Sequence, residues 1–317
     1  MFDNLCDVPG VLVGHASDGV GLTGCTVVYF EEPAVVGVDV RGSSPETRGT
    51  AGLHPTGIVA QRHALLLTGG SAFGLAAADG VNRFLEERGV GLDVGMTRIP
   101  LVSSAVLFDL AVGDASARPD AAMGYQAVLR AESGDFEQGS VGAGVGATVG
   151  NVLGMERAMK GGLGSTSVRL ESGLVVAALT AVNAFGGVRD PSTGEILAGP
   201  RMDDGTLGDT VALLETARPR WGENTTLGIV ATNARLTKPQ ATKVAEMAHD
   251  GLARVIEPVH TSVDGDVVFA AAVGDEEVAT DVVGAWGARV ISEAVLRAIR
   301  FARGTHDLPS ASEVGQG

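Results

Sequence analysis

The segment from 141 to 187 interleaves glycine with small and β-branched apolar residues, as VGAGVGATVG, KGGLGSTSVRL and GLVVAALTAVNAFGG. Glycine fills 46 of the 317 positions, about twice its usual share of roughly 7%. Aromatic residues make up only 4% of the chain. Glycine and alanine let layers approach closely, while valine and isoleucine fill buried strands. The sequence therefore predicts an α/β protein with sheets buried between helices, and it is long enough for a substantial core.

Short apolar runs, bounded by glycine, proline or acidic residues, predict the strands of these sheets. They lie at 10–14, 26–30, 34–40, 63–70, 226–233 and 266–273. Helices are predicted from Ser71 as cap to about Arg88, from Thr237 as cap with Pro239 as an early helical residue, and over about 279–302. The polar stretch 188–224 predicts a surface linker with at most one short helix, and the tail 304–317 is expected to be disordered.

The charge of the chain argues against two classes of partner. Its 38 acidic and 23 basic residues give a formal net charge of −15, which opposes binding to nucleic acid or to an anionic lipid surface. The start MFDNLCDVPG lacks the pattern of a signal peptide, and no apolar run reaches about 18 residues. We therefore expect a cytoplasmic protein, in which Cys6 and Cys25 are reduced thiols without a functional role.

Two glycine-rich motifs and the histidines offer weak signals. GAGVGA at 142–147 fits a dinucleotide fingerprint but lacks a clear preceding strand and a following helix. GGSAFG at 69–74 resembles a nucleophile elbow, yet Phe73 stands where glycine is needed, so a helix cap is the better interpretation of Ser71. The six histidines are scattered without metal-ligand spacing. We expect neither a nucleotide cofactor nor a metal.

GENTTLGIV at 222–230 is a different kind of signal, because a polar stretch ends in Asn-Thr-Thr where a buried strand begins. Cleavage between Asn224 and Thr225 would leave Thr225 leading that strand. An N-terminal threonine carries its own base, an α-amine with a pKa of about 7.7 to 8.0. On these residues alone, turn and strand propensity are the better explanation of the motif.

Five further segments accompany this motif in the order of a known family. They are RGSSPETRGT at 41–50, GGSAFGLAAADGV at 69–81, MKGGLGSTS at 159–167, AVNAFG at 181–186 and VDGD at 263–266. Together with GENTTLGIVAT they resemble the P1 peptidase family, also called the DmpA or S58 family, and especially its nylon-oligomer hydrolase branch. The resemblance runs from about residue 8 to 302. It implies a precursor that cuts itself before a serine or threonine and then hydrolyses amides with that residue.

The resemblance also implies roles for individual residues. Thr225 would be the nucleophile, and its being threonine favours the nylon-hydrolase branch over the β-aminopeptidase branch. Lys160 would lie beside it as a cation, or else be a solvated loop lysine. Asn183 would donate to the developing oxyanion, and amid apolar residues it needs hydrogen bonds in any case. Asp264 and Asp266 would bind or orient the N-terminal threonine, unless VDGD is only a turn.

At three positions the chain departs from the family pattern. Ser43 and Glu46 replace glycines that are common in the RGGxPGTR segment, which affects the expected loop shape. Phe108 stands where some relatives carry tyrosine, so a tyrosine hydroxyl at the oxyanion site is not expected.

The fold implied by the resemblance is a four-layered αββα sandwich of the N-terminal-nucleophile type. Residues 1–317 would form one hydrolase domain, cut into chains 1–224 and 225–317 that stay together. Relatives assemble as homo-oligomers, commonly tetramers. The expected activity is hydrolysis of linear amides such as 6-aminohexanoate oligomers or short peptides. An aminopeptidase or β-aminopeptidase of the same family is the alternative, and a non-catalytic binding protein that keeps the fold is a third possibility.

Overall fold

The computed structural model describes residues 1–217, 224–305 and 308–314. Its first part contains β1 (Val11–Asp18), β2 (Thr23–Val40), β3 (Thr47–Arg48), β4 (Gln61–Thr68), α1 (Ala77–Glu87), β5 (Leu92–Asp93), β6 (Arg98–Ile99), β7 (Val102–Val106) and α2 (Ala121–Leu129). The glycine-rich segment forms β8 (Thr148–Val149), β9 (Met159–Lys160), β10 (Gly162–Arg169) and β11 (Val175–Asn183). The last part contains β12 (Gly187–Arg189), β13 (Ile196–Ala198), α3 (Thr210–Leu213), β14 (Thr225–Ala234), α4 (Lys238–Ala253), β15 (Ile256–Glu257), β16 (Val267–Glu276), α5 (Thr280–Phe301) and α6 (Ala311–Val314).

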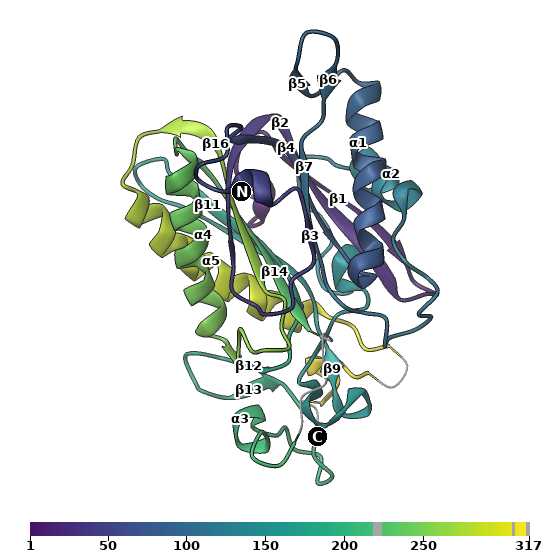
Figure 1. Cartoon of the computed structure of the whole chain (residues 1–317). Helices are drawn as coiled ribbons and strands as arrows, with labels where there is room; N and C mark the ends of the chain where they lie inside the picture. The colour runs from purple at the N-terminus through teal and green to yellow at the C-terminus, as the bar shows by residue number, and fades with distance from the viewer. Residues whose placement is uncertain (218–223, 306–307, 315–317) are drawn as a thin grey trace.

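The long helices cover two sides of the strands, with α4 and α5 on one side and α1 and α2 on the other (Figure 1). Between them, hydrogen bonds join the strands in the order β10-β11-β14-β16-β2-β4-β7-β3, with β1 paired to β2. The small sheet β13-β12-β15 lies apart from this ladder. The strands β14 and β16 run parallel at its centre, so the start of β14 is enclosed by neighbours on both sides.

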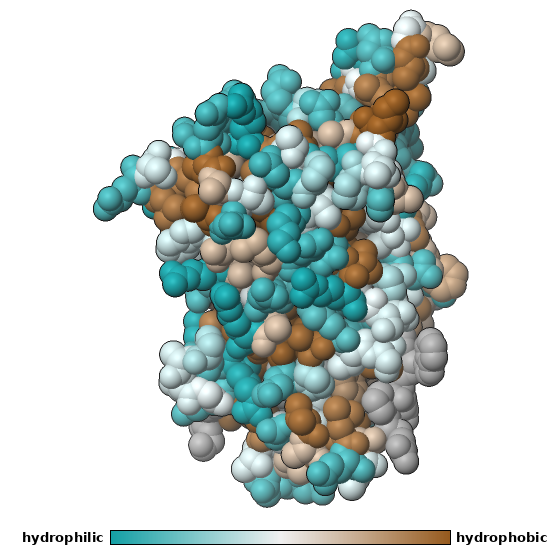
Figure 2. All heavy atoms as spheres, turned by 60° about the vertical axis from the view of Figure 1, so that its left-hand side comes forward, coloured by the Kyte–Doolittle hydropathy of each residue, from teal (hydrophilic) through white to brown (hydrophobic). Residues whose placement is uncertain are grey.

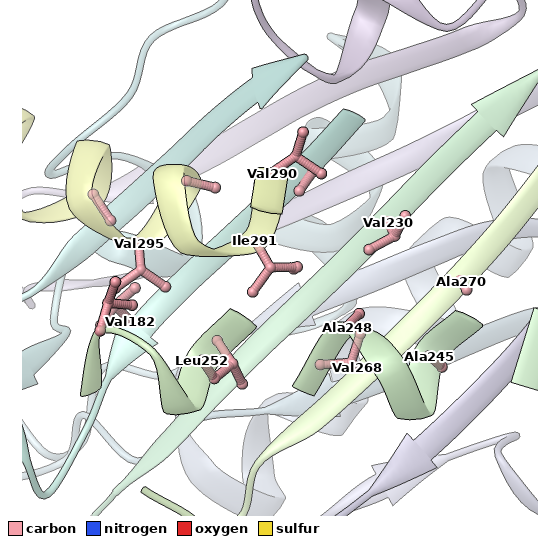
Figure 3. Close-up of a cluster of buried hydrophobic side chains, with 14 of the residues drawn as sticks. Val182, Val230, Ala245, Ala248, Leu252, Val268, Ala270, Val290, Ile291 and Val295 are labelled. Carbon is pink, nitrogen blue, oxygen red and sulfur yellow. The ribbon is translucent and has the colours of Figure 1, made fainter. Parts of the chain in front are cut away.

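Alternate side chains of the strands divide the interior into three stacked cores. On β11, Val176 belongs to the core under α4 and α5, whereas Ala177 faces a second core shared with β4. On β4, Leu65 lies in that second core and Leu66 in a third core, under α1 and α2. Figure 3 shows the first core, to which Ile291 of α5 and Val230 of β14 both belong. Helix, strand, strand and helix layers follow one another, as the αββα prediction requires.

A single long strand connects the two inner layers, which differs from the prediction of separate strands at 26–30 and 34–40. The strand β2 pairs with β4 through Cys25–Tyr29 and with β16 through Val35–Val40. Its register with β4 shifts between Tyr29 and Ala34. The prediction was wrong because a bulge and an exposed edge accommodate the acidic residues and Pro33 without ending the strand.

Glycine lets helices lie directly against strands, as two positions illustrate. A Cβ at Gly164 of β10 would lie 2.0 Å from the carbonyl oxygen of Ala294 in α5. A Cβ at Gly37 of β2 would lie 2.1 Å from the backbone nitrogen of Thr242 in α4. The high glycine content therefore serves the close layer packing expected from composition.

The prediction that Ser71 caps a helix is wrong. The α-helix α1 begins only at Ala77, after a 3-10 turn over Ser71–Ala76 whose N-cap is Gly70. Gly70 and Ser71 both have positive φ, +83° and +52°. The backbone needs this left-handed turn to leave β4, and it takes Ser71 out of the extended conformation of a capping residue. By contrast, Thr237 is the N-cap of α4, as predicted, and its backbone N–H donates to Oε1 of Gln240 at 2.8 Å in a capping box.

The described part of the tail after Arg303 also differs from the expected disorder. Residues 311–314 form the short helix α6, and Leu308 is buried with Leu22, Val112, Val145 and Ala158. The carbonyl oxygen of Pro309 accepts a 2.9 Å hydrogen bond from the backbone nitrogen of Lys160. The tail is ordered here because an apolar side chain and a backbone acceptor both find partners on the body of the protein.

The hairpin β5–β6 projects from the body beside α1 (Figure 1). Met96 at its tip is 90% exposed, and Leu92, Val94 and Ile99 are exposed as well. Figure 2 shows apolar atoms on this projection at the top of the molecule. Such a projecting apolar hairpin is a candidate contact surface.

Candidate active site

The bond between Asn224 and Thr225 lies where the polar stretch ends and β14 begins. Asn224 is 2% exposed and Thr225 is 4% exposed. Asn224 forms a parallel bridge with Asp264, and Thr225 pairs with Asn183 of β11. Residues 218–223 of the predicted linker fall outside the described residues. The two residues of the expected cleavage bond are therefore both buried and fixed by neighbouring backbone.

Two donors converge on the carbonyl oxygen of Asn224. The backbone N–H of Gly265 donates to it at 3.0 Å. The hydroxyl of Thr225 donates to the same oxygen at 2.5 Å. An N–H donor polarises a carbonyl and stabilises negative charge that develops on its oxygen. The arrangement thus places the hydroxyl of Thr225 beside a polarised carbonyl group.

Glycine is required at position 265, a feature that the sequence reasoning missed. A Cβ there would lie 2.5 Å from the carbonyl oxygen of Ser44 and 2.7 Å from Oγ1 of Thr225. The loop at Ser44 is held by its N–H, which donates to the carbonyl oxygen of Asp264 at 2.9 Å. Ser43 and Glu46 have no positive φ, so the departures in this loop do not strain it. The glycine between the two acids of VDGD was the available signal.

Asn151 orients the side chain of Asn224 and was also missed. Its Nδ2 donates to Oδ1 of Asn224 at 2.8 Å and lies 3.8 Å from Sδ of Met155. The two asparagines are 73 residues apart in the chain. No local pattern in the sequence could have indicated this contact.

Asn183 is fully buried and hydrogen-bonded on both sides of its amide. Its Oδ1 accepts from the backbone nitrogen and the hydroxyl of Thr148, at 2.9 and 3.2 Å. Its Nδ2 donates to the carbonyl oxygen of Phe108 at 2.9 Å. Phe108 thus contacts Asn183 through its backbone carbonyl oxygen. The amide is held rigidly, directly opposite Thr225 in the ladder.

Lys160 is fully buried, which excludes the solvated loop lysine. Its Nζ donates to the carbonyl oxygens of Val145 at 2.7 Å and Ala147 at 2.8 Å, and lies 3.4 Å from that of Gly144. These carbonyls come from the GAGVGA motif. Carbonyl oxygens bind a cation and repel a phosphate.

Two opposing effects act on the ammonium of Lys160. Burial lowers its pKa to about 7, while the carboxylate of Asp109 acts in the opposite direction. Three carbonyl oxygens match the three N–H donors of a charged ammonium. Asp109 is itself buried, accepting from the hydroxyl of Thr23 and the N–H of Gly70 at 2.7 Å each. Burial raises the pKa of Asp109, while the ammonium of Lys160 lowers it. Each of the two buried groups therefore stabilises the charged form of the other.

The two acids after β15 are both buried but have different partners. Asp264 accepts from the N–H of Phe185 at 3.3 Å and from the N–H and hydroxyl of Thr261 at 3.0 and 2.5 Å. Asp266 accepts from the N–H of Thr226 at 2.6 Å. Burial, and then the neighbouring Asp266, raise the pKa of Asp264 to about 6.

The residues singled out in the sequence converge on one end of β11, β14 and β16. Thr225 faces Asn183, and the two acids flank the backbone on either side of Thr225. Lys160 is connected less directly, since it pairs with Thr148, which bonds Asn183. Within the described residues, no hydrogen bond joins the side chains of Lys160 or the two acids to Thr225 itself.

Other kinds of site find no support in the described residues. They contain no group of three or more His, Cys, Asp or Glu side chains that could hold a metal ion. In the same part of the chain, no helix is long and apolar enough to cross a bilayer. Cys6 and Cys25 are both buried and unpaired.

Comparisons with known proteins identify relatives over most of the chain. The profile of peptidase family S58 matches residues 3–309. An uncharacterized aminopeptidase of Mycobacterium bovis is 43% identical over 291 residues, covering 86% of this chain and 82% of that protein. A 6-aminohexanoate-oligomer endohydrolase of Kocuria sp. is 34% identical over 270 residues, covering 83% and 73%.

Two solved structures share the fold. A β-aminopeptidase of Burkholderia sp. superposes with a TM-score of 0.75 at 21% identity, covering 99% of this chain and 92% of that one. The L-aminopeptidase D-Ala-esterase/amidase of Ochrobactrum anthropi, described as a variant of the Ntn hydrolase fold, gives 0.74 at 20% identity, covering 98% and 91%. The chain therefore belongs to peptidase family S58, a family of amide-bond hydrolases with the N-terminal-nucleophile fold.

Proposed function

We propose that the protein cuts its own Asn224–Thr225 bond and then uses Thr225 to hydrolyse amides. The observation that carries this proposal is the convergence of the Thr225 hydroxyl and the Gly265 N–H on the carbonyl oxygen of Asn224.

In the proposed maturation, Oγ1 of Thr225 attacks the carbonyl carbon of Asn224, and the C–N bond breaks. The amide nitrogen leaves with the hydroxyl proton, so that an ester joins Asn224 to Thr225. Water then hydrolyses the ester, giving a carboxylate on Asn224 and a free amine and hydroxyl on Thr225. Chains 1–224 and 225–317 would stay together, because β14 is buried between β11 and β16.

In turnover the freed hydroxyl would attack a substrate amide, with the α-amine of Thr225 as its base. That amine would then pass the proton to the leaving amine, and water would release the acyl group. Asn183 would stabilise the oxyanion, and the positive charge of Lys160 would lower the pKa of the attacking group. Asp264 and Asp266 would orient the new terminus from either side. This chemistry uses no metal or organic cofactor.

We propose linear amides such as 6-aminohexanoate oligomers or short peptides as substrates. Support comes from the relative that is a 6-aminohexanoate-oligomer endohydrolase and from threonine, rather than serine, at position 225. Aminopeptidase activity is the second candidate, and the 43% identity to a mycobacterial aminopeptidase favours it.

Rates of hydrolysis of aminohexanoate oligomers and of aminoacyl anilides would separate the two substrates. Faster cleavage of the oligomers at internal bonds supports the first, and faster release of the anilide supports the second. Thr225→Ala should hydrolyse neither. A Thr225→Ala variant that retains the parental rate would contradict the proposed nucleophile.

We also propose that the protein is a cytoplasmic homotetramer. The tetramer is implied by the family resemblance, and the exposed apolar side chains of the β5–β6 hairpin support a contact between copies. Light scattering coupled to size exclusion would measure the assembly. Replacing Met96 with Asp should reduce the mass of the particle if the hairpin forms that contact.

A further inference from the structure

The carboxylate of Asp266 has two kinds of partner, one on each oxygen. Oδ1 accepts from the N–H of Thr226 at 2.6 Å. Oδ2 accepts from the backbone N–H of His260 at 3.1 Å and lies 2.7 Å from Nδ1 of the same residue. A carboxylate oxygen only accepts, so Nδ1 donates. One histidine therefore holds the side of Asp266 that faces away from the nucleophile strand.

The backbone of His260 is in a conformation that few residues other than glycine adopt. Its φ is +55°, in the left-handed region. This conformation aims the N–H and the ring nitrogen at the same oxygen, and it carries a backbone cost. The strain is therefore localised at His260, whose backbone N–H and ring Nδ1 both donate to Oδ2 of Asp266.

The ring of His260 is also packed on its other side. It lies edge to face against the ring of His249, with centroids 4.7 Å apart and an interplanar angle of 73°. His249 is buried in α4 and held through its Nε2, 3.1 Å from the carbonyl oxygen of Asp39. Within the described residues, Nε2 of His260 is buried and has no hydrogen-bond partner. The ring is thus fixed by packing, and its one hydrogen bond goes to Asp266.

The position of Thr226 matters because cleavage would make Thr225 a chain end. Asn224 is held by its bridge to Asp264 and by the N–H of Gly265. After cleavage, Asn224 would no longer be covalently bonded to Thr225, so these contacts would no longer restrain Thr225. The peptide group between Thr225 and Thr226 would then hold the nucleophile from its C-terminal side only. The bond from the Thr226 N–H to Asp266 fixes the plane of that group.

We propose that His260 is a positioning residue, which holds Asp266 so that the Thr226 N–H, and with it the hydroxyl and amine of Thr225, stay aligned for attack. The proposal rests on the function proposed above for Thr225. In this role His260 acts through Asp266. Its effect should appear in the rate of the chemical step, because misalignment of a nucleophile by a fraction of an ångström lowers the rate more than it weakens binding.

His260→Gly tests this role, because glycine accepts the positive φ and keeps the backbone N–H to Asp266 while removing the ring. We expect kcat to fall about 10- to 100-fold, the range for losing one hydrogen bond to a charged group, with KM changed less. Conversion to two chains should slow in the same variant. His260→Asn should restore most of the rate, since its Nδ2 is bonded to Cγ as Nδ1 is in histidine and asparagine tolerates positive φ.

His260→Gln is the matched control, because it carries the same amide one atom further out. If His260→Gly fails to fold, the comparison of His260→Asn with His260→Gln still decides the question. Asparagine should give about 10-fold higher kcat than glutamine. Parental kcat in His260→Gly, a change confined to KM, or equal rates for asparagine and glutamine would overturn the role of His260. A parent protein that never forms two chains would instead overturn the proposed function, so the two failures are distinguishable.

Discussion

Gly265→Ala should slow maturation strongly while leaving the rest of the fold in place. The new Cβ would lie 2.5 Å from the carbonyl oxygen of Ser44 and 2.7 Å from Oγ1 of Thr225. A Cβ atom essentially never comes within 3.0 Å of a heavy atom outside its own residue and its two chain neighbours. The carbonyl of Ser44 is backbone and cannot rotate aside, so the peptide at position 265 and the Thr225 hydroxyl must move instead.

The size of the effect follows from the two groups that move. Overpacking in a closed site costs about 1–3 kcal/mol of folding stability. Loss of one preorganised donor to a developing oxyanion costs about 10²- to 10³-fold in rate in other hydrolases. We therefore expect maturation to slow by at least about 100-fold, with only a modest loss in the free energy of unfolding.

Intact-mass spectrometry over time after expression would measure the rate of conversion, and thermal unfolding would measure stability. Gly287→Ala in α5 is the matched control, because its Cβ would find ordinary contacts of 3.5 Å or more. That variant should mature at the parental rate and lose no stability, since alanine favours helix over glycine. If Gly265→Ala matures as fast as the parent, the Gly265 N–H is not part of the cleavage chemistry.

Three further predictions concern the charged and polar neighbours. Lys160 has a folded-state pKa of about 7, below its ordinary value of 10.5. Between pH 7 and 10.5 the unfolded chain therefore binds more protons than the folded protein. The free energy of unfolding should rise with pH in this range. Lys160→Met should flatten that rise in urea titrations and slow both maturation and turnover. Asp264 has a folded-state pKa of about 6, above 3.8, so its contribution to stability should fall as pH rises from about 4 to 6, and Asp264→Asn should remove this fall. Asn151→Ala releases the side chain of Asn224 and should slow maturation, but the matured enzyme should keep parental turnover, because Asn224 is then only a chain end.

The sequence predicted features that depend on neighbouring residues. The change from polar GEN to apolar TLGIV placed the start of β14 next to Thr225, and the structure begins that strand at Thr225 itself. Alternation and capping residues likewise indicated β16, α4 and α5. The grouping of Lys160, Asn183 and the two acids came from the order of motifs in a known family, not from spacing.

The features that were missed depend on contacts between distant segments. The bond from Asn151 to Asn224, the packing of His249 on His260, and the buried partner Asp109 join elements that only the fold brings together. The wrong cap at Ser71 has the same origin, because its left-handed turn is fixed by the N–H bond to the carbonyl oxygen of Leu107. Local propensity carries no information about such partners.

The mass of the denatured protein tests most directly the claim that Thr225 becomes a free N-terminus. The account predicts two chains of roughly 23 and 9 kDa from the 32.1 kDa precursor, in proportion to their lengths, with threonine as the first residue of the smaller one. Thr225→Ala should remain a single chain, since it lacks the attacking hydroxyl but loses little core volume. A parent protein that hydrolyses amides while remaining one 32.1 kDa chain would contradict the account, as would a new terminus at any residue other than Thr225.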